Sequence, residues 1–262
     1  MKPRRLGQEW KRASLSLLAR VPVLLRACRR RATAEQVHEL RVVLRRLRLL
    51  LRVGRPLAGE ADVTAFIDWS RRICTAAGPL RDDDVAIEWL GNRKHAEPIG
   101  CQITKRRSKR TVVFRRRLVA MPGAMRRAMA RVKDDAEQGQ TLRKRFVKRV
   151  ATLRRALEHG SPRFFRLGVE AQHEFRRCLR QWRYLREFDR ALGREPGDPA
   201  LKALTRLQEA IGEFQNLKIV EATLPRDRTA ASRLLRRVLL KDQARWLARI
   251  QKRLHAATAG WR

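Results

Sequence analysis

Two segments of this chain carry arginines three and four positions apart, with large apolar residues between them. Residues 38–53 read HELRVVLRRLRLLLRV, and residues 173–188 read HEFRRCLRQWRYLREF. Side chains at these spacings share one face of an α-helix, while the leucines between them fall on another face. The first line comprises His38, Arg41, Arg45, Arg48 and Arg52; the second comprises His173, Arg176, Arg180 and Arg183. The chain must therefore bury two amphipathic helices, each with a positively charged edge.

Such lines of like charge are unfavourable by themselves. Each pair at this spacing destabilises a helix by about 0.2–0.5 kcal/mol. Folding alone does not explain why the arrangement occurs twice, whereas a polyanion lying along each line does.

Helix start and stop signals divide the whole chain into a series of predicted helices. Thr33 and Gln36 form a capping box, and Gly54 followed by Pro56 ends the helix that carries the first line. No segment alternates apolar and polar residues between hairpin turns, so the sequence predicts an all-α fold. Further helices are expected over residues 62–77, 82–90, 98–121, 124–138, 141–158, 161–192, 200–211, 216–223 and 229–255, with a turn at 195–199.

The order of these elements recurs after about 135 residues, a period too long for a solenoid unit. The segment AAGPLRDDDV at 76–85 corresponds to AIGEFQNLKI at 210–219. Two homologous helical bundles, each with an apolar face to cover, fit this pattern. We expect one domain over residues 1–262, with a first repeat and connector at 1–138 and a second repeat at 139–262.

The charge balance indicates an anionic partner. The chain has 63 Lys and Arg against 26 Asp and Glu, which gives a formal net charge of +37. Solubility requires a magnitude of only about 2–8 in a small domain. Nucleic acid, polyphosphate and an acidic membrane surface are the candidate partners. Most of the basic residues are arginine, which binds phosphate oxygens in a bidentate way, although a GC-rich genome also favours arginine codons.

Other features of the composition point to a cytoplasmic protein. No apolar run approaches about 18 residues, so no membrane-spanning helix is expected. The first residues do not resemble a secretory signal. Four scattered cysteines without a CxxC pair favour reduced thiols, with neither a zinc site nor a disulfide framework.

The sequence resembles the CHAD family, the conserved histidine α-helical domain. The resemblance rests on the repeated H-x-x-R-x-x-x-R-x-x-R helix and on Leu80, Arg81, Asp82, Asp84 and Val85 downstream, with Tyr184 in the second half. It implies two pseudo-symmetric four-helix bundles around a basic central groove that binds inorganic polyphosphate, often at polyphosphate granules. Many relatives carry this domain beside a triphosphate-tunnel (CYTH) domain. Because the many strands and the ExExK signature of that domain are missing here, a stand-alone CHAD domain is expected.

A phosphate chain also suits the residues considered by themselves. Polyphosphate has no base to read, so it requires regularly spaced Arg and Lys rather than aromatic platforms. Arginines one helical turn apart are separated by about 5.4 Å along the axis, which a flexible phosphate chain can follow. Other basic lines could supply an opposite wall, although each is also compatible with a solvated face. Besides the two arginine lines, the candidate ligand-binding residues are Arg106, Lys109, Arg110, Lys144, Arg145, Lys148, Arg237 and Lys241.

The histidines and the acidic cluster have alternative explanations. His38 and His173 could contact phosphate, bond to a carboxylate such as Asp82 or Asp84 in the core, or accept a phosphoryl group. Asp82 and Asp84 could bind Mg²⁺, but carboxylates in the first turn of a helix ordinarily cap it. In the second half, Asn216 and Lys218 stand at the corresponding positions, and Glu187 stands where Arg52 does.

No nucleophile set, glycine-rich phosphate loop or Cys–His cluster is present, so neither catalysis, a metal nor a cofactor is expected. The leading hypothesis is a non-enzymatic polyphosphate-binding protein, cytoplasmic or at polyphosphate granules, with no membrane partner. One alternative is a nonspecific nucleic-acid-binding protein, and a polyphosphate-binding protein is also expected to bind nucleic acid weakly. The other alternative is a Mg²⁺-dependent enzyme acting on polyphosphate. A bundle that only scaffolds protein partners would show no salt-dependent affinity for polyanions.

Overall fold

In a computed structural model of the chain, the described residues are 2–91, 93–133, 135–191, 199–225 and 229–259. They form α-helices, one 3₁₀ turn and no strand, which confirms the all-α prediction. None of the helices over these residues combines the length and apolar character needed to span a bilayer. The expected turn at 195–199 lies almost wholly outside the described residues.

Two compact units divide the chain, and they do not follow the sequence repeats. Unit 1 comprises residues 1–81 and 107–149, and unit 2 comprises residues 82–106 and 150–262. Each unit therefore contains a segment from either side of the expected repeat boundary at 138/139. The expected division at that boundary and the pseudo-symmetric pair of bundles stay predictions.

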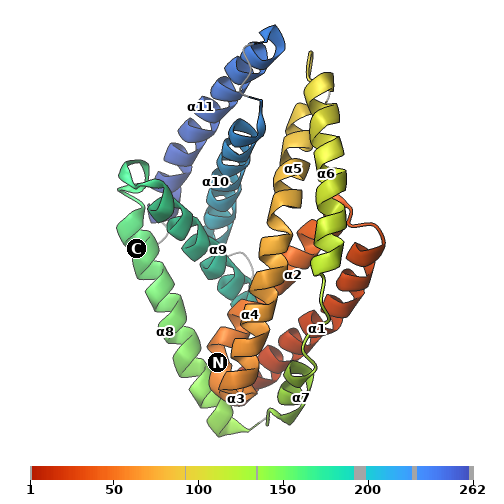
Figure 1. Cartoon of the computed structure of the whole chain (residues 1–262). Helices are drawn as coiled ribbons and strands as arrows, with labels where there is room; N and C mark the ends of the chain where they lie inside the picture. Colours follow the sequence, from red (N-terminus) through yellow and green to blue (C-terminus); the bar gives the residue numbers. More distant parts are fainter. Residues whose placement is uncertain (1, 92, 134, 192–198, 226–228, 260–262) are drawn as a thin grey trace. The chain divides into compact units, whose positions relative to one another are not determined.

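Unit 1 is built on the antiparallel pair of α1 (Pro3–Arg30) and α2 (Ala34–Val53), which lie side by side in Figure 1. The short helix α3 (Arg55–Ala58), α4 (Glu60–Ala76) and α7 (Ala124–Arg131) pack against this pair. The fully buried Trp10 joins α1 to α2, because its indole Nε1 donates to the Leu50 carbonyl at 2.8 Å. Gly54 lies against the same ring, since a Cβ there would be 2.1 Å from Trp10.

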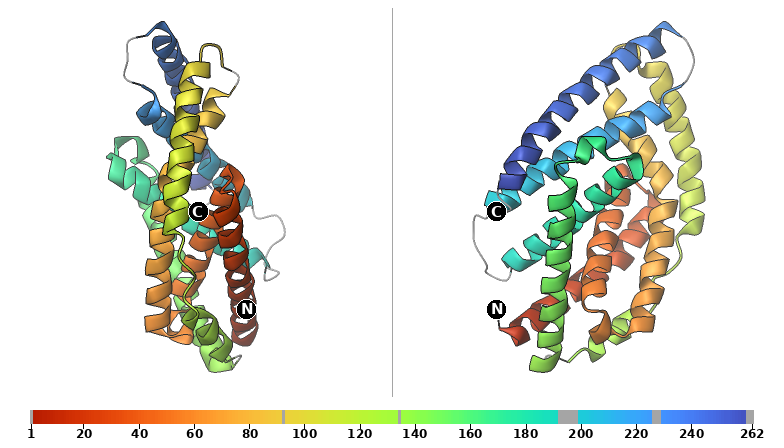
Figure 2. Two further views of the ribbon diagram at one scale, coloured as in Figure 1. Left: turned by 45° about the vertical axis from the view of Figure 1, so that its right-hand side comes forward. Right: turned by 90° about the vertical axis from the view of Figure 1, so that its left-hand side faces the viewer.

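Unit 2 contains α9 (Val169–Ala191), α10 (Pro199–Thr223) and α11 (Ala230–Ala259). Helices α10 and α11 pack along each other, as the right-hand view of Figure 2 shows. Their apolar residues share one core with the hairpin of residues 82–106. That core comprises Val85, Ala86, Leu90, Ala96, Ile99, Ile103, Leu217, Val220, Leu224, Leu235 and Leu239.

Three helices carry the chain from one unit to the other. They are α5 (Gly78–Leu90), α6 (Glu97–Arg117) and α8 (Ala136–Gly160). Helix α8 begins earlier than expected, because Asp135 caps it by accepting from the Gln138 backbone N–H at 2.7 Å. The connector predicted at 124–138 is therefore α7 followed by the start of α8, and α6 ends four residues before the expected position.

Two sequence-based boundaries in unit 2 are wrong. Pro162 does not open a helix: Phe164 is buried against Phe175, with ring centroids 5.2 Å apart, and this contact holds a 3₁₀ turn at Phe164–Arg166. The expected break between residues 211 and 216 is missing, because α10 is continuous there. Unlike the break after Ala76, which Pro79 follows, this region has no proline and buries Ile211, Phe214 and Leu217 on one face.

Candidate functional site: an arginine ridge on α2

The first basic line forms an arginine ridge on α2, which we define as Arg41, Arg45, Arg48 and Arg52. The helix begins as expected, because Thr33 accepts from the Gln36 N–H and the Gln36 side chain accepts from the Thr33 N–H, each at 3.2 Å. All four ridge arginines are partly buried. The leucines of the same helix are fully buried: Leu40, Leu44, Leu47 and Leu51 are all 0% exposed. The ridge therefore lies at the edge of the core of unit 1, as the sequence predicted.

The ridge arginines have few acidic partners. Arg41 donates to the Cys74 carbonyl at 3.0 Å, and Arg48 approaches the Cys74 Sγ at 3.8 Å. Within the described part of the chain, neither Arg45, Arg48 nor Arg52 forms an ion pair with a carboxylate. Their positive charges are thus not neutralised by the protein's own described side chains.

The pKa values of two ridge arginines reflect this uncompensated charge. Burial and the neighbouring Arg45 and Arg71 lower the pKa of Arg48, partly offset by Cys74. Burial, followed by repulsion from Arg71, Arg48, Arg149 and Arg55, lowers the pKa of Arg52. Guanidinium groups from α2, α4 and α8 therefore crowd together, and an anion would relieve their repulsion.

Arg71 is a member of this basic cluster that the spacing argument did not identify. It lies on α4, where no line of basic residues marks it, and it pairs with Asp68 at 2.9 Å. Only the packing of α4 against α2 brings it near Arg48 and Arg52. Arg149 does continue a visible pattern, since it follows Arg145 by four positions on α8.

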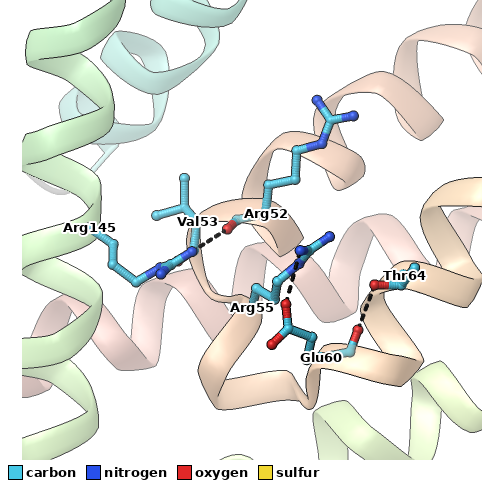
Figure 3. A network of polar contacts seen from close by, with 6 residues as sticks. All are labelled: Arg52, Val53, Arg55, Glu60, Thr64 and Arg145. Atoms are coloured by element: carbon cyan, nitrogen blue, oxygen red, sulfur yellow. Dashed lines mark hydrogen bonds and ion pairs between the residues drawn. The ribbon is translucent and has the colours of Figure 1, made fainter.

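Arg145 has a different position from the ridge arginines. Its Nε donates to the Val53 carbonyl at 2.8 Å and its Nη2 to the Arg52 carbonyl at 3.2 Å. Figure 3 shows the guanidinium of Arg145 reaching from α8 to the end of α2, with the Arg52 side chain extending away from it. In the same figure, Arg55 pairs with Glu60 at 3.1 Å.

The other candidates of unit 1 are distributed along its surface. Lys109, Lys144 and Lys148 are exposed, and Arg110 donates to the Pro79 carbonyl at 3.1 Å. His38 is exposed at the start of the ridge, and His173 is exposed on α9. Exposure of both histidines disfavours the alternative that they are core residues.

The second basic line, on α9, is more neutralised than the first. Arg183 donates its Nε to Gln208 at 2.6 Å and its Nη1 to Glu187 at 2.7 Å. Arg176 and Arg180 are partly buried. The apolar neighbours Phe175, Leu179 and Trp182 are buried, as expected. Because Glu187 occupies the position equivalent to Arg52, the acid that shortens this line also neutralises its last arginine.

Arg106 and the acidic cluster form an internal contact of unit 2. Asp83 is fully buried, and its Oδ1 accepts from the Nε and Nη2 of Arg106 at 2.9 and 2.6 Å. Asp84 is also buried. Arg237 and Lys241 are exposed on α11. No cluster of three or more His, Cys, Asp or Glu side chains suited to a metal ion occurs in the described portion.

Chemically, the ridge and its neighbours offer charge-assisted hydrogen bonds to an anion. The structure brings Arg45, Arg48 and Arg52 together with Arg71 and Arg149 in unit 1. It places Arg106 and Arg183 in internal ion pairs of unit 2. The expectation that both lines share one groove concerns the two units together and stays a prediction.

Comparisons with known proteins agree with the sequence resemblance. The sequence matches the CHAD domain family over residues 16–225. A crystal structure of the CHAD domain from the plant Ricinus communis is similar with a TM-score of 0.65 and 20% identity, over 98% of this chain and 91% of that one. PptA from Streptomyces chartreusis is similar with a TM-score of 0.54 and 16% identity, over 99% of both chains. No curated protein matches the sequence. With a family match over most of its length and the same fold as a solved CHAD domain, the chain belongs to the CHAD family.

Proposed function

We propose that this CHAD chain binds inorganic polyphosphate through the arginine ridge, without catalysing a reaction on it. The observation that carries the proposal is that Arg45, Arg48 and Arg52 are partly buried at the edge of a core and form no ion pair with a described carboxylate. Partial burial strengthens a contact between guanidinium and phosphate relative to one in bulk water. Burial, followed by repulsion from neighbouring arginines, lowers the pKa of Arg48 and of Arg52, and a bound anion would relieve that repulsion.

The shape of the ridge favours a linear phosphate chain over a nucleic acid. Successive ridge arginines are about one helical turn, or roughly 5.4 Å, apart along α2. Residues 38–53 contain no Phe, Tyr or Trp on which a base could stack. Binding at the ridge would also hold the chain on the surface of a polyphosphate granule, which is the location we propose for it.

A titration with polyphosphates of graded length, beside duplex DNA and heparin, tests the ligand class. Counterion release requires the logarithm of the binding constant to fall linearly with the logarithm of the salt concentration, by about 0.7 per contacted phosphate in a single strand. At about 0.1 M salt, each such contact contributes about fivefold to the affinity. If duplex DNA displaces long polyphosphate at equal charge, the proposed ligand is wrong.

A matched pair of variants tests the site. Arg45→Gln with Arg52→Gln removes two ridge charges, whereas Arg126→Gln with Arg127→Gln removes two exposed charges from α7 of the same unit. We expect the ridge variant to lose about 25-fold in affinity at about 0.1 M salt, with a slope lower by about 1.4. The α7 variant should bind within about twofold of the parent. Equal losses in both variants would mean that net charge rather than the ridge determines binding.

The absence of catalysis is tested separately. The protein is incubated with Mg²⁺ and long polyphosphate, and both free phosphate and chain length are followed. We expect neither to change. Phosphate release that disappears with Asp84→Asn would instead support the enzymatic alternative.

A further inference from the structure

The first half of α8 packs against the rest of unit 1 at two contacts. The first contact is with the end of α2. Arg52 and Val53 are among the last residues of α2, whose carbonyls have no partner within the helix. Arg145 donates to both carbonyls, at 3.2 and 2.8 Å, and brings a positive charge to the negative end of the helix dipole. These are favourable, directional contacts that use the Nε and Nη2 of the guanidinium.

The second contact is at Gly139, which is buried against the start of α1. A Cβ at this position would lie 2.3 Å from the Pro3 carbonyl oxygen and 2.9 Å from the Arg4 nitrogen. Because the obstacle is backbone rather than a flexible side chain, only glycine allows α8 to approach α1 this closely.

This docking brings two like charges together. Arg149 lies one turn beyond Arg145 on the same face of α8, and it is near enough to Arg52 to repel it. The contacts of Arg145 and Gly139 thus hold α8 where its next arginine is repelled by the ridge. Repulsion between Arg52 and Arg149 opposes this packing, whereas an anion between the two guanidinium groups would relieve it.

We propose that Arg145 is a positioning residue that holds Arg149 opposite Arg52, so that one segment of a phosphate chain bridges α2 and α8. The inference rests on the proposed function and assigns a contact role to Arg149 and an indirect one to Arg145. It gives the ligand a course across two helices of unit 1 instead of along α2 alone. It also predicts that a ligand fastens α8 more firmly to unit 1.

The slope of affinity against salt separates the two roles. Arg149→Gln removes one phosphate contact, so affinity should fall about fivefold at about 0.1 M salt and the slope by about 0.7. Arg145→Gln should do the same, because Arg149 is then no longer held in place. In the double variant the effects should not add, and the total loss should stay near fivefold. A 25-fold loss with a slope lower by about 1.4 would show that both arginines contact phosphate, and would overturn the assignment.

A variant that changes no charge provides the second measurement. Gly139→Ala forces α8 away from Pro3 without altering the number of basic groups. We expect the same loss of about fivefold as for Arg149→Gln, and no further loss when the two are combined. An unchanged affinity in Gly139→Ala, with the helical circular dichroism retained, would refute the positioning role. This cycle remains informative if Arg145→Gln fails to fold.

The two proposals fail in different ways. If the unaltered chain shows no salt-dependent affinity for polyphosphate, the proposed function fails. If it binds and the ridge variant does not, while Arg145 and Arg149 behave additively, only the positioning inference fails.

Discussion

Arg52 should destabilise the folded protein when no ligand is bound. Its guanidinium is partly desolvated and is repelled by Arg71, Arg48, Arg149 and Arg55, in that order. Each close pair of like charges costs about 0.2–0.5 kcal/mol, so four pairs amount to about 1–2 kcal/mol. Because Arg55 and Arg71 each pair with a carboxylate, we take the lower end, about 1 kcal/mol.

Replacing Arg52 by methionine keeps most of the apolar stem and removes the charge. We therefore expect Arg52→Met to stabilise the ligand-free protein by about 1 kcal/mol, which corresponds to about 2–4 °C in Tm for a chain of this size. The measurement is thermal unfolding followed by circular dichroism at low ionic strength. Arg126→Met, on the exposed face of α7, is the control and should leave Tm unchanged.

Salt and ligand distinguish this explanation from a simple gain of packing. The Debye length falls from about 10 Å at 0.1 M to about 3 Å at 1 M salt, so the advantage of Arg52→Met should shrink as salt is added. With polyphosphate added, the parent should have the higher Tm, because the ligand stabilises the parent by mass action and stabilises Arg52→Met less. If Arg52→Met is destabilised, or if its Tm gain is independent of salt, the charge-repulsion argument is refuted.

Three further predictions concern other parts of the molecule. Glu187→Gln should remove the charge that neutralises Arg183 and raise polyphosphate affinity about fivefold at 0.1 M salt, as measured by titration; an unchanged affinity would exclude Arg183 from the site. Asp83→Ala should destabilise the protein in urea unfolding by about 1–2 kcal/mol, because two hydrogen bonds to Arg106 are lost while that side chain, 38% exposed, regains water; an unchanged stability would contradict the assignment. Burial raises the pKa of Cys28 from 9.0 to about 11, so this thiol should stay unlabelled by maleimide at pH 8. The contribution of the buried neutral thiol to the free energy of unfolding should be complete below pH 9 and lost as the pH rises through 11.

Local signals predicted the ridge helix well. The capping box at Thr33 and the glycine at position 54 define α2 because the groups that satisfy its first turn and end it are neighbours in sequence. Burial of Leu44 and Leu47 followed from the same 3.6-residue period. Where a distant aromatic residue decided the outcome, as at Phe164, the prediction failed.

The roles of individual basic residues were harder to infer. Arg106 and Arg145 looked like members of solvent-facing lines, yet each is held by a partner remote in sequence: Arg106 by Asp83, and Arg145 by the carbonyl of Val53. Arg71 joined the basic cluster without any periodic signal on its own helix. Pairings of this kind depend on helix packing, which the spacing of charges within one helix does not encode.

The interleaving of the two units has a consequence for dissecting the molecule. A cut at the repeat boundary would strip the hydrophobic partners of Leu217 and Leu235 from unit 2, because Val85, Ile99 and Ile103 precede that cut. The same cut would take the Arg145 cap away from the end of α2 in unit 1. Neither excised fragment should therefore be a folded protein by itself, although the two expressed together should reassemble. The segments on either side of the expected repeat boundary therefore depend on each other for their cores, so expressing them one at a time is the wrong way to dissect this chain.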